Sequence, residues 1–120
     1  MFKIKAIDYR VIPHQSQRYN TCGDYFEDKE VKGLVHFRVS DMRNTKYETL
    51  VLVHEIVEYV LVKMAGIKVA DIDVFDLAFD ITNPLYNEPG DDPAAPYHIQ
   101  HVMATSIERI LAIFLGVDWE

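Results

Sequence analysis

The sequence that decides the fold is TKYETLVLVHEIVEYVLVKMAG, residues 45–66. Asn44 or Thr45 can cap a helix at its start, and Glu48 stands three residues after Thr45 as in a capping box. Gly66 is suited to the helix end. Apolar residues recur at the spacing of one helical face: Leu50, Val53, Val57, Val60, Leu61 and Met64. We therefore expect a helix of about five turns.

Two strands are predicted before this helix. Residues 2–12 alternate apolar and polar side chains at their beginning, and residues 31–40 alternate in the same way. We expect these two strands to pair in a small antiparallel sheet. Residues 13–30, which separate them, are polar and aromatic and predict a long loop. Loops beyond about 12 to 15 residues usually carry a function or hidden structure.

Two more helices are expected after the first. Residues 71–81 are typical of a short amphipathic helix, since apolar and acidic side chains fall on opposite sides: Ile72, Phe75 and Phe79 against Asp73, Asp76 and Asp80. Residues 82–96 are dense in Pro, Asn, Asp and Gly and predict a loop. A last helix is expected to begin near residues 94–97, with Pro96 in its first turn, and to run to Gly116.

Together these elements predict one α+β domain over residues 1–120, with a small antiparallel sheet packed on two long helices and a short one. The 49% of apolar and 26% of charged residues are typical of a globular protein. No apolar run approaches the roughly 20 residues of a membrane span. The start lacks the apolar core of a signal peptide, and the single cysteine, Cys22, fits a reducing compartment. We expect a cytoplasmic protein without a membrane partner.

The charge distribution bears on the choice of partners. The net charge is −7, and between Lys68 and Arg109 there are eight acidic residues and no Lys or Arg. A protein without a basic patch has little means of neutralising phosphates, so a nucleic-acid partner is not expected. An acidic segment can attract cations, although it also serves simply to keep a surface solvated.

Residues of metal-binding type occur on both long helices. His54 and Glu58 are four residues apart, which places them one turn apart on the same stripe of the first helix. His98 and His101 lie near one face of the last helix, and Glu108 continues that line. If the two helices pack together, imidazole and carboxylate groups converge. That set suits zinc, or iron or manganese when more carboxylates join.

The segment HEIVE, residues 54–58, resembles the HExxH signature of zincin metallopeptidases, with Glu58 in place of the second histidine. The layout is also similar, because in zincins a strand bordering the substrate cleft precedes the helix that carries the motif. The resemblance implies a zincin-like core that acts on a peptide or protein. It also implies that His54 is a zinc ligand, that Glu55 is the general base, and that His101 or His98 is a further ligand. The carboxylate at Glu58 implies a more anionic site and a weaker Lewis acid.

The chain as a whole is similar to small uncharacterised bacteriophage or prophage proteins. The similar stretches are LVLVHEIVEYVL, EPGDDPAAPYH and ATSIERILAIFLGVDWE. This resemblance covers most of the length and implies the cytoplasm of a bacterial host, but it implies no activity.

Three functions stay open. The first is a metal-dependent hydrolase with the ligands and the base named above. The second is a non-catalytic accessory protein that acts through an exposed aromatic patch around Tyr19, Tyr25 and Phe26. The third is a two-metal oxidoreductase site in which Glu55 and Glu108 join the ligands.

A further group of potential ligands, His14, Cys22 and Asp24, lies in the predicted loop but lacks CxxC spacing. We expect no metal there. The acids of residues 71–80 do not follow the pattern of a calcium loop either.

Overall fold

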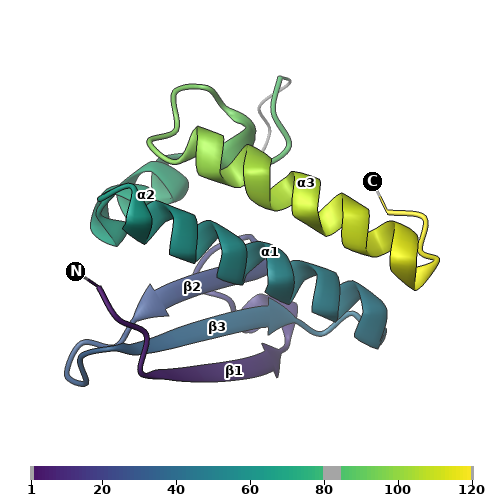
Figure 1. Ribbon diagram of the computed structural model, residues 1–120, viewed down its shortest axis with the longest axis horizontal. Helices are drawn as coiled ribbons and strands as arrows, with labels where there is room; N and C mark the ends of the chain where they lie inside the picture. The colour runs from purple at the N-terminus through teal and green to yellow at the C-terminus, as the bar shows by residue number, and fades with distance from the viewer. Residues whose placement is uncertain (1, 80–84, 120) are drawn as a thin grey trace.

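The computed structural model describes residues 2–79 and 85–119. The main elements, in chain order, are β1 (Ala6–Ile12), β2 (Gly23–Glu27), β3 (Leu34–Ser40), α1 (Thr45–Met64), α2 (Val69–Ala78) and α3 (His98–Leu115). Two short 3-10 helices occur at His14–Ser16 and Pro89–Asp91. Figure 1 shows a sheet, α1 lying across it, and α3 on the far side of α1. The predicted α+β class is confirmed.

The sheet is mixed, with the strand order β1-β3-β2. β3 pairs antiparallel with β2 and parallel with β1. The predicted antiparallel pairing of β1 with β3 is therefore wrong. The reason is that β2 lies within residues 13–30, the predicted loop, and runs back along the sheet before β3 begins. β2 is difficult to predict from the sequence because it is short. Its adjacent residues Asp24 and Tyr25 are both buried, so apolar and polar residues do not alternate along it.

The first long helix begins after the cap Asn44 and ends just before Gly66, as predicted, but the predicted capping box of Thr45 with Glu48 is wrong because Asn44 is the cap. The Asn44 side chain accepts a hydrogen bond of 3.2 Å from the backbone N–H of Tyr47. Glu48 Oε2 accepts one of 2.8 Å from the backbone N–H of Met42, two residues before the cap. The first N–H groups of a helix have no partner within it, and the Asn44 side chain satisfies that of Tyr47. The bond from Met42 instead ties the chain before the cap to the first turn of α1.

The buried face of α1 differs from the prediction. Its buried residues are Leu50, His54, Glu58, Tyr59 and Val62, whereas the predicted Met64 is exposed. The apolar pattern misleads because α1 is covered on two sides, by the sheet and by α3, so apolar residues are spread around it. His54 and Glu58 lie within the buried surface rather than at its border.

Two apolar clusters hold α1 in place. Residues of the first join the sheet to α1: Tyr25, Val35, Phe37 and Tyr59, with Val69 of α2. Residues of the second join α1 to α2 and to the segment before α3: Val62, Ile72, Ala95 and Tyr97. Each large buried side chain contributes about 1.5 to 3 kcal/mol of transfer free energy. The clusters therefore fix the position of α1 against the sheet, α2 and the segment that leads into α3.

The short helix α2 buries one acid that the pattern assigns to its polar side. Asp76 is buried with Ile72. Its carboxylate accepts hydrogen bonds from the hydroxyls of Tyr19 and Tyr97. The predicted polar position Asp80 lies outside the described residues, as does the rest of the segment to residue 84.

The last helix ends as predicted but begins later. α3 starts at His98 after the N-cap Tyr97, so Pro96 precedes the helix instead of lying in its first turn, and the helix stops at the C-cap Gly116, whose φ of 68° is left-handed. Glycine adopts this conformation without a Cβ penalty, which explains the stop. Within the described residues, neither α3 nor any other helix has the length and hydropathy to cross a bilayer.

Candidate metal centre

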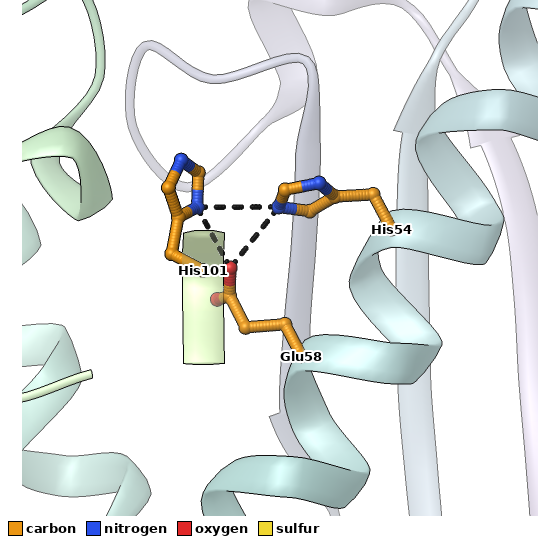
Figure 2. A group of neighbouring side chains, drawn as sticks. All are labelled: His54, Glu58 and His101. Carbon is orange, nitrogen blue, oxygen red and sulfur yellow. Dashed lines mark hydrogen bonds and ion pairs between the residues drawn. The ribbon is translucent and has the colours of Figure 1, made fainter. Parts of the chain in front are cut away.

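Three side chains from α1 and α3 meet between the two helices. His54 Nε2 lies 3.1 Å from Glu58 Oε2 and 3.2 Å from His101 Nδ1, and His101 Nδ1 lies 2.9 Å from Glu58 Oε2. Figure 2 shows the three atoms pointing toward a common centre. All three residues are buried. We call this group the triad.

The dimensions of the triad match one face of a metal coordination shell. With zinc bonds of about 2.0 to 2.1 Å in tetrahedral geometry, neighbouring ligand atoms are roughly 3.3 Å apart. The three observed separations, 2.9, 3.1 and 3.2 Å, are close to that value. Three lone-pair atoms can approach one another this closely around a cation or around shared protons. The donor set and the spacing therefore both fit a metal ion.

The second nitrogen of each imidazole lies beside a carboxylate. His54 Nδ1 is 2.7 Å from Glu108 Oε1, an ion-pair contact without hydrogen-bond geometry. His101 Nε2 is 3.0 Å from Asp91 Oδ1. Histidine ligands of metals are commonly oriented in this way, because the outer carboxylate fixes the tautomer and raises the basicity of the ligating nitrogen.

The remaining oxygen of Glu58 is also engaged. Tyr25 donates a hydrogen bond of 2.9 Å from its hydroxyl to Glu58 Oε1, which leaves Oε2 facing the triad. Burial raises the pKa of Tyr25 well above its usual range, so the hydroxyl keeps its proton at neutral pH. Tyr25 comes from β2, and the strand that adjoins the triad is therefore β2 rather than β3, the strand directly before α1.

A close backbone approach holds His101 in place. A Cβ added at Gly90 would lie only 2.6 Å from His101 Nδ1 and would overlap the ring. Gly90 is buried in the short 3-10 helix that also supplies Asp91. Only glycine leaves room for the ring at this position, so the segment 88–91 forms one wall of the site.

His98 lies outside the triad. Its Nδ1 is 2.8 Å from the backbone carbonyl of Gly90, to which it can donate a hydrogen bond. His98 and His101 are about 60° apart around a helix, and only the packing of α3 on α1 decides which of them faces His54. The structure brings together three of the four predicted ligands.

Electrostatics in the triad favour charged side chains when no metal is bound. Burial opposes protonation of His54, but contacts with Glu108 and Glu58 outweigh it and raise the pKa to about 11. Burial likewise opposes protonation of His101, but Glu58 and Glu88 raise its pKa to about 10. Burial opposes ionisation of Glu58, yet hydrogen bonds from both histidines lower its pKa to about 2. A metal ion must therefore displace protons from both imidazoles.

Glu55 lies beside the triad without belonging to it. Its Oε2 is 3.9 Å from His54 Nε2. Burial raises the pKa of Glu55 well above its ordinary value, and the negative charge of Glu58 adds to this effect. Gly23 makes room for the side chain, since a Cβ there would lie 2.9 Å from Glu55 Cγ and Cδ. A buried carboxyl group with a raised pKa is suited to general acid and base chemistry.

Two hollows adjoin these residues. A cavity of about 40 Å³ lies against the triad, Glu55 and Asp76. A cleft of about 390 Å³ lies on the other side of His54 and Glu55 and extends along Arg109 and Trp119. The small cavity has room for an ion and water only. The cleft has the size of a small-ligand site.

A second group of potential ligands shares His101. Glu88, Asp91 and His101 each offer one ligand atom within 4.8 Å of the others. The two-metal prediction assigns Glu108 to such a site, but Glu108 lies behind His54, next to Nδ1. The Glu88 side chain is 65% exposed. This outer group is more open to water than the triad.

The other candidates from the sequence have different roles. Asp24 is buried and binds Arg18 through two hydrogen bonds, of 2.7 and 2.9 Å. The His14 nitrogens contact Ser40 and Asn20 rather than Cys22. These pairings give the loop a structural role.

The predicted aromatic patch is not exposed. Tyr25 is buried, and Tyr19 and Phe26 are partly buried. The residues of the site that sequence reasoning missed are Tyr25, Gly90 and Asp91. The EPGDD sequence signals a turn, but nothing in it signals contact with His101.

Comparison with known protein families, curated proteins and solved structures finds no match to this chain.

Proposed function

We propose that this protein binds one zinc ion through His54 Nε2, Glu58 Oε2 and His101 Nδ1, and that it hydrolyses a peptide or protein substrate. The observation that carries the proposal is the triad itself, three buried ligand atoms 2.9 to 3.2 Å apart. The resemblance of residues 54–58 to the HExxH signature supports the same assignment.

Zinc is assigned to the triad because of the motif that carries two of its ligands. Two imidazoles and one carboxylate are the set found in many catalytic zinc sites, where a fourth position stays open. The same set also holds Fe(II) in non-haem enzymes, so the choice of zinc depends on the resemblance of residues 54–58 to the HExxH signature, with Glu55 next to the triad. A bound zinc ion would supply Lewis-acid activation of water, lowering the pKa of that water to about 7.

Glu55 acts as the general base in this proposal. Its carboxyl is 12% exposed and lines the cavity beside the triad, where the carboxylate form can accept a proton from water and later return it to the leaving group. Burial raises the pKa of Glu55 in the metal-free protein, and the positive charge of a bound zinc ion would favour the carboxylate form. Asp91 orients the imidazole of His101, Tyr25 orients Glu58, and Glu108 places a negative charge beside His54 Nδ1.

The cleft of about 390 Å³ is the place for the substrate. Met42, Val51 and Trp119 give it apolar walls, and Arg109 is a cation at its rim. Its size suits a few residues of a peptide chain. His54 and Glu55 line both the cleft and the cavity, so a bond held in the cleft lies next to the base.

The test separates metal binding from hydrolysis. The protein is incubated with zinc, free zinc is removed by dialysis, and the zinc content per chain is measured. Activity is measured on a mixture of quenched fluorescent peptides. We expect about one zinc per chain, and we expect Glu55→Gln to keep the zinc and lose the activity. Glu30→Gln is the matched control, because Glu30 is exposed and distant from the triad in the sequence.

Each half of the proposal has its own contradicting result. A wild-type protein without zinc would end the metal assignment. A Glu55→Gln protein that loses its zinc would make Glu55 a ligand rather than a base. A zinc-bound wild type that cleaves no peptide would end the hydrolase assignment alone.

A further inference from the structure

The outer surface of α3 is apolar along its whole length. Six large apolar side chains on the face away from α1 are 45% to 84% exposed: Ile99, Val102, Met103, Ile110, Ile113 and Phe114. They follow the 3- and 4-residue spacing of one helical stripe. Figure 1 shows α3 as a layer on the far side of α1 from the sheet. We call these residues the α3 outer stripe.

The stripe contains no polar group that needs water as its hydrogen-bond partner. Ser106 is the polar residue at its middle, and its hydroxyl donates a hydrogen bond of 2.9 Å to the backbone carbonyl of Val102. No charged residue lies within the stripe, and Arg109 stands beside it. A surface of this kind can be covered without leaving a polar group unsatisfied.

The area is that of a protein interface. The exposed fractions of the six side chains correspond to on the order of 800 Å² of accessible surface, the amount that each partner buries in a standard-size interface. Contiguous apolar patches on monomers rarely exceed about 300 to 600 Å². The stripe is therefore larger than an isolated chain normally exposes.

The stripe is also symmetric along the helix. Ser106 lies midway between Ile99 and Ile113, and Val102 and Ile110 are four residues to either side of it. Two such helices that cross antiparallel about a two-fold axis at Ser106 place Ile99 against Ile113 and Val102 against Ile110 of the second copy. The small serine at the axis lets the helices approach closely, with large side chains on both sides.

We infer that the α3 outer stripe is the interface of a two-fold symmetric dimer, in which α3 packs antiparallel on α3 of a second copy. A lipid surface fits less well, because interfacial helices carry several Lys and Arg residues, whereas Arg109 is the only Lys or Arg in α3. The dimer does not depend on the proposed zinc site, since His101 lies on the opposite, buried face of α3.

Sedimentation velocity in the presence of a chelator tests the inference apart from any metal. At about 100 µM protein we expect a dimer. Ile110→Glu should raise the dissociation constant at least about 100-fold, because it places two like charges near the axis. Val74→Glu is the matched control, because Val74 is an exposed apolar residue on α2, 71% exposed against 57% for Ile110, and the substitution should leave the dimer intact. A monomeric wild type, or an Ile110→Glu protein that dimerises like the wild type, would overturn the inference.

Cysteine cross-linking tests the antiparallel arrangement. In a Cys22→Ser background, Ser106→Cys should form an intermolecular disulfide on mild oxidation, because the two residues meet at the axis. Ile99→Cys should not, because its copies lie about 20 Å apart in that arrangement. Equal cross-linking of both variants would contradict antiparallel packing. Circular dichroism of each variant confirms that the fold is kept.

Discussion

Replacement of His101 by glutamine should remove most of the effect of zinc on the stability of the fold. Glutamine keeps a side-chain amide that can donate to Glu58 Oε2, but it lacks the lone pair that His101 Nδ1 directs to the centre of the triad. The packing of α3 on α1 is therefore largely kept, and a zinc ligand is lost.

The magnitude follows from mass action. Zinc at 100 times its dissociation constant stabilises the folded protein by about 2.7 kcal/mol, which for a domain of this size raises Tm by roughly 10 °C. Loss of a direct ligand should weaken binding by at least about 100-fold, the upper limit for loss of an outer partner. At the same zinc concentration the stabilisation then falls to about 0.4 kcal/mol, and the rise in Tm to about 2 °C.

The assay is a pair of thermal unfolding curves, with zinc and with a chelator, for each protein at pH 7.5. The zinc-dependent difference is compared rather than Tm itself, because His101→Gln also affects the metal-free fold. The pKa of His101 is raised to about 10, so its ion pairs stabilise the metal-free protein fully below about pH 6.5, and that contribution is lost as the pH rises through 10.

His98→Gln is the matched control, since it is the same substitution one helical turn earlier, on a residue that contacts Gly90 instead of the triad. It should keep the full rise in Tm with zinc. A wild type whose Tm ignores zinc, or a His98→Gln protein that loses as much of the effect as His101→Gln, would refute the reasoning. Calorimetric titration in buffers of different ionisation enthalpy should also show release of protons on zinc binding.

Three further outcomes are expected. Gly90→Ala should lower zinc affinity at least about 10-fold, because its Cβ would overlap the His101 ring; calorimetric titration measures this. Tyr25→Phe removes the hydrogen bond to Glu58 Oε1 and should weaken zinc binding by about 10- to 100-fold in the same titration. Burial raises the pKa of Asp76 to about 6 against the donated tyrosine hydrogen bonds. In metal-free protein its contribution to stability is therefore present below about pH 4 and is lost as the pH rises through 6. Asp76→Asn should remove that loss. At pH 8 its free energy of unfolding, measured with urea, should exceed that of the wild type by on the order of 1 to 3 kcal/mol.

Controls for these variants come from the same chain. Gly66→Ala introduces a Cβ into open space at a φ of 76°, so it should cost about 1 kcal/mol of stability without changing zinc affinity. Tyr59→Phe is the control for Tyr25→Phe, because it removes a hydroxyl that donates to Glu27 rather than to Glu58, and it should leave zinc affinity unchanged. If the free energy of unfolding of Asp76→Asn depends on pH in the same way as that of the wild type, ionisation of Asp76 does not destabilise the fold and this prediction is wrong.

The sequence by itself determined the two long helices and one half of the site. Caps and helical periodicity act within a single turn or two, so Asn44 and Gly116 mark helix ends wherever the helices lie in space. The spacing of His54 and Glu58 similarly guarantees that both side chains leave α1 on one stripe. Local geometry suffices for these features because the backbone hydrogen bonds of a helix never leave the segment.

Only the tertiary structure decided the rest. The choice of His101 over His98 depends on how α3 is rotated against α1, and the roles of Tyr25 and Gly90 depend on a strand and a turn brought to the triad by the two apolar clusters. The sequence also did not indicate that β1 pairs parallel with β3. Alternation of apolar and polar residues predicts that a strand exists, but it does not indicate the direction of the neighbouring strand. Such contacts join residues tens of positions apart, and their geometry is set by packing of the whole core rather than by any local pattern.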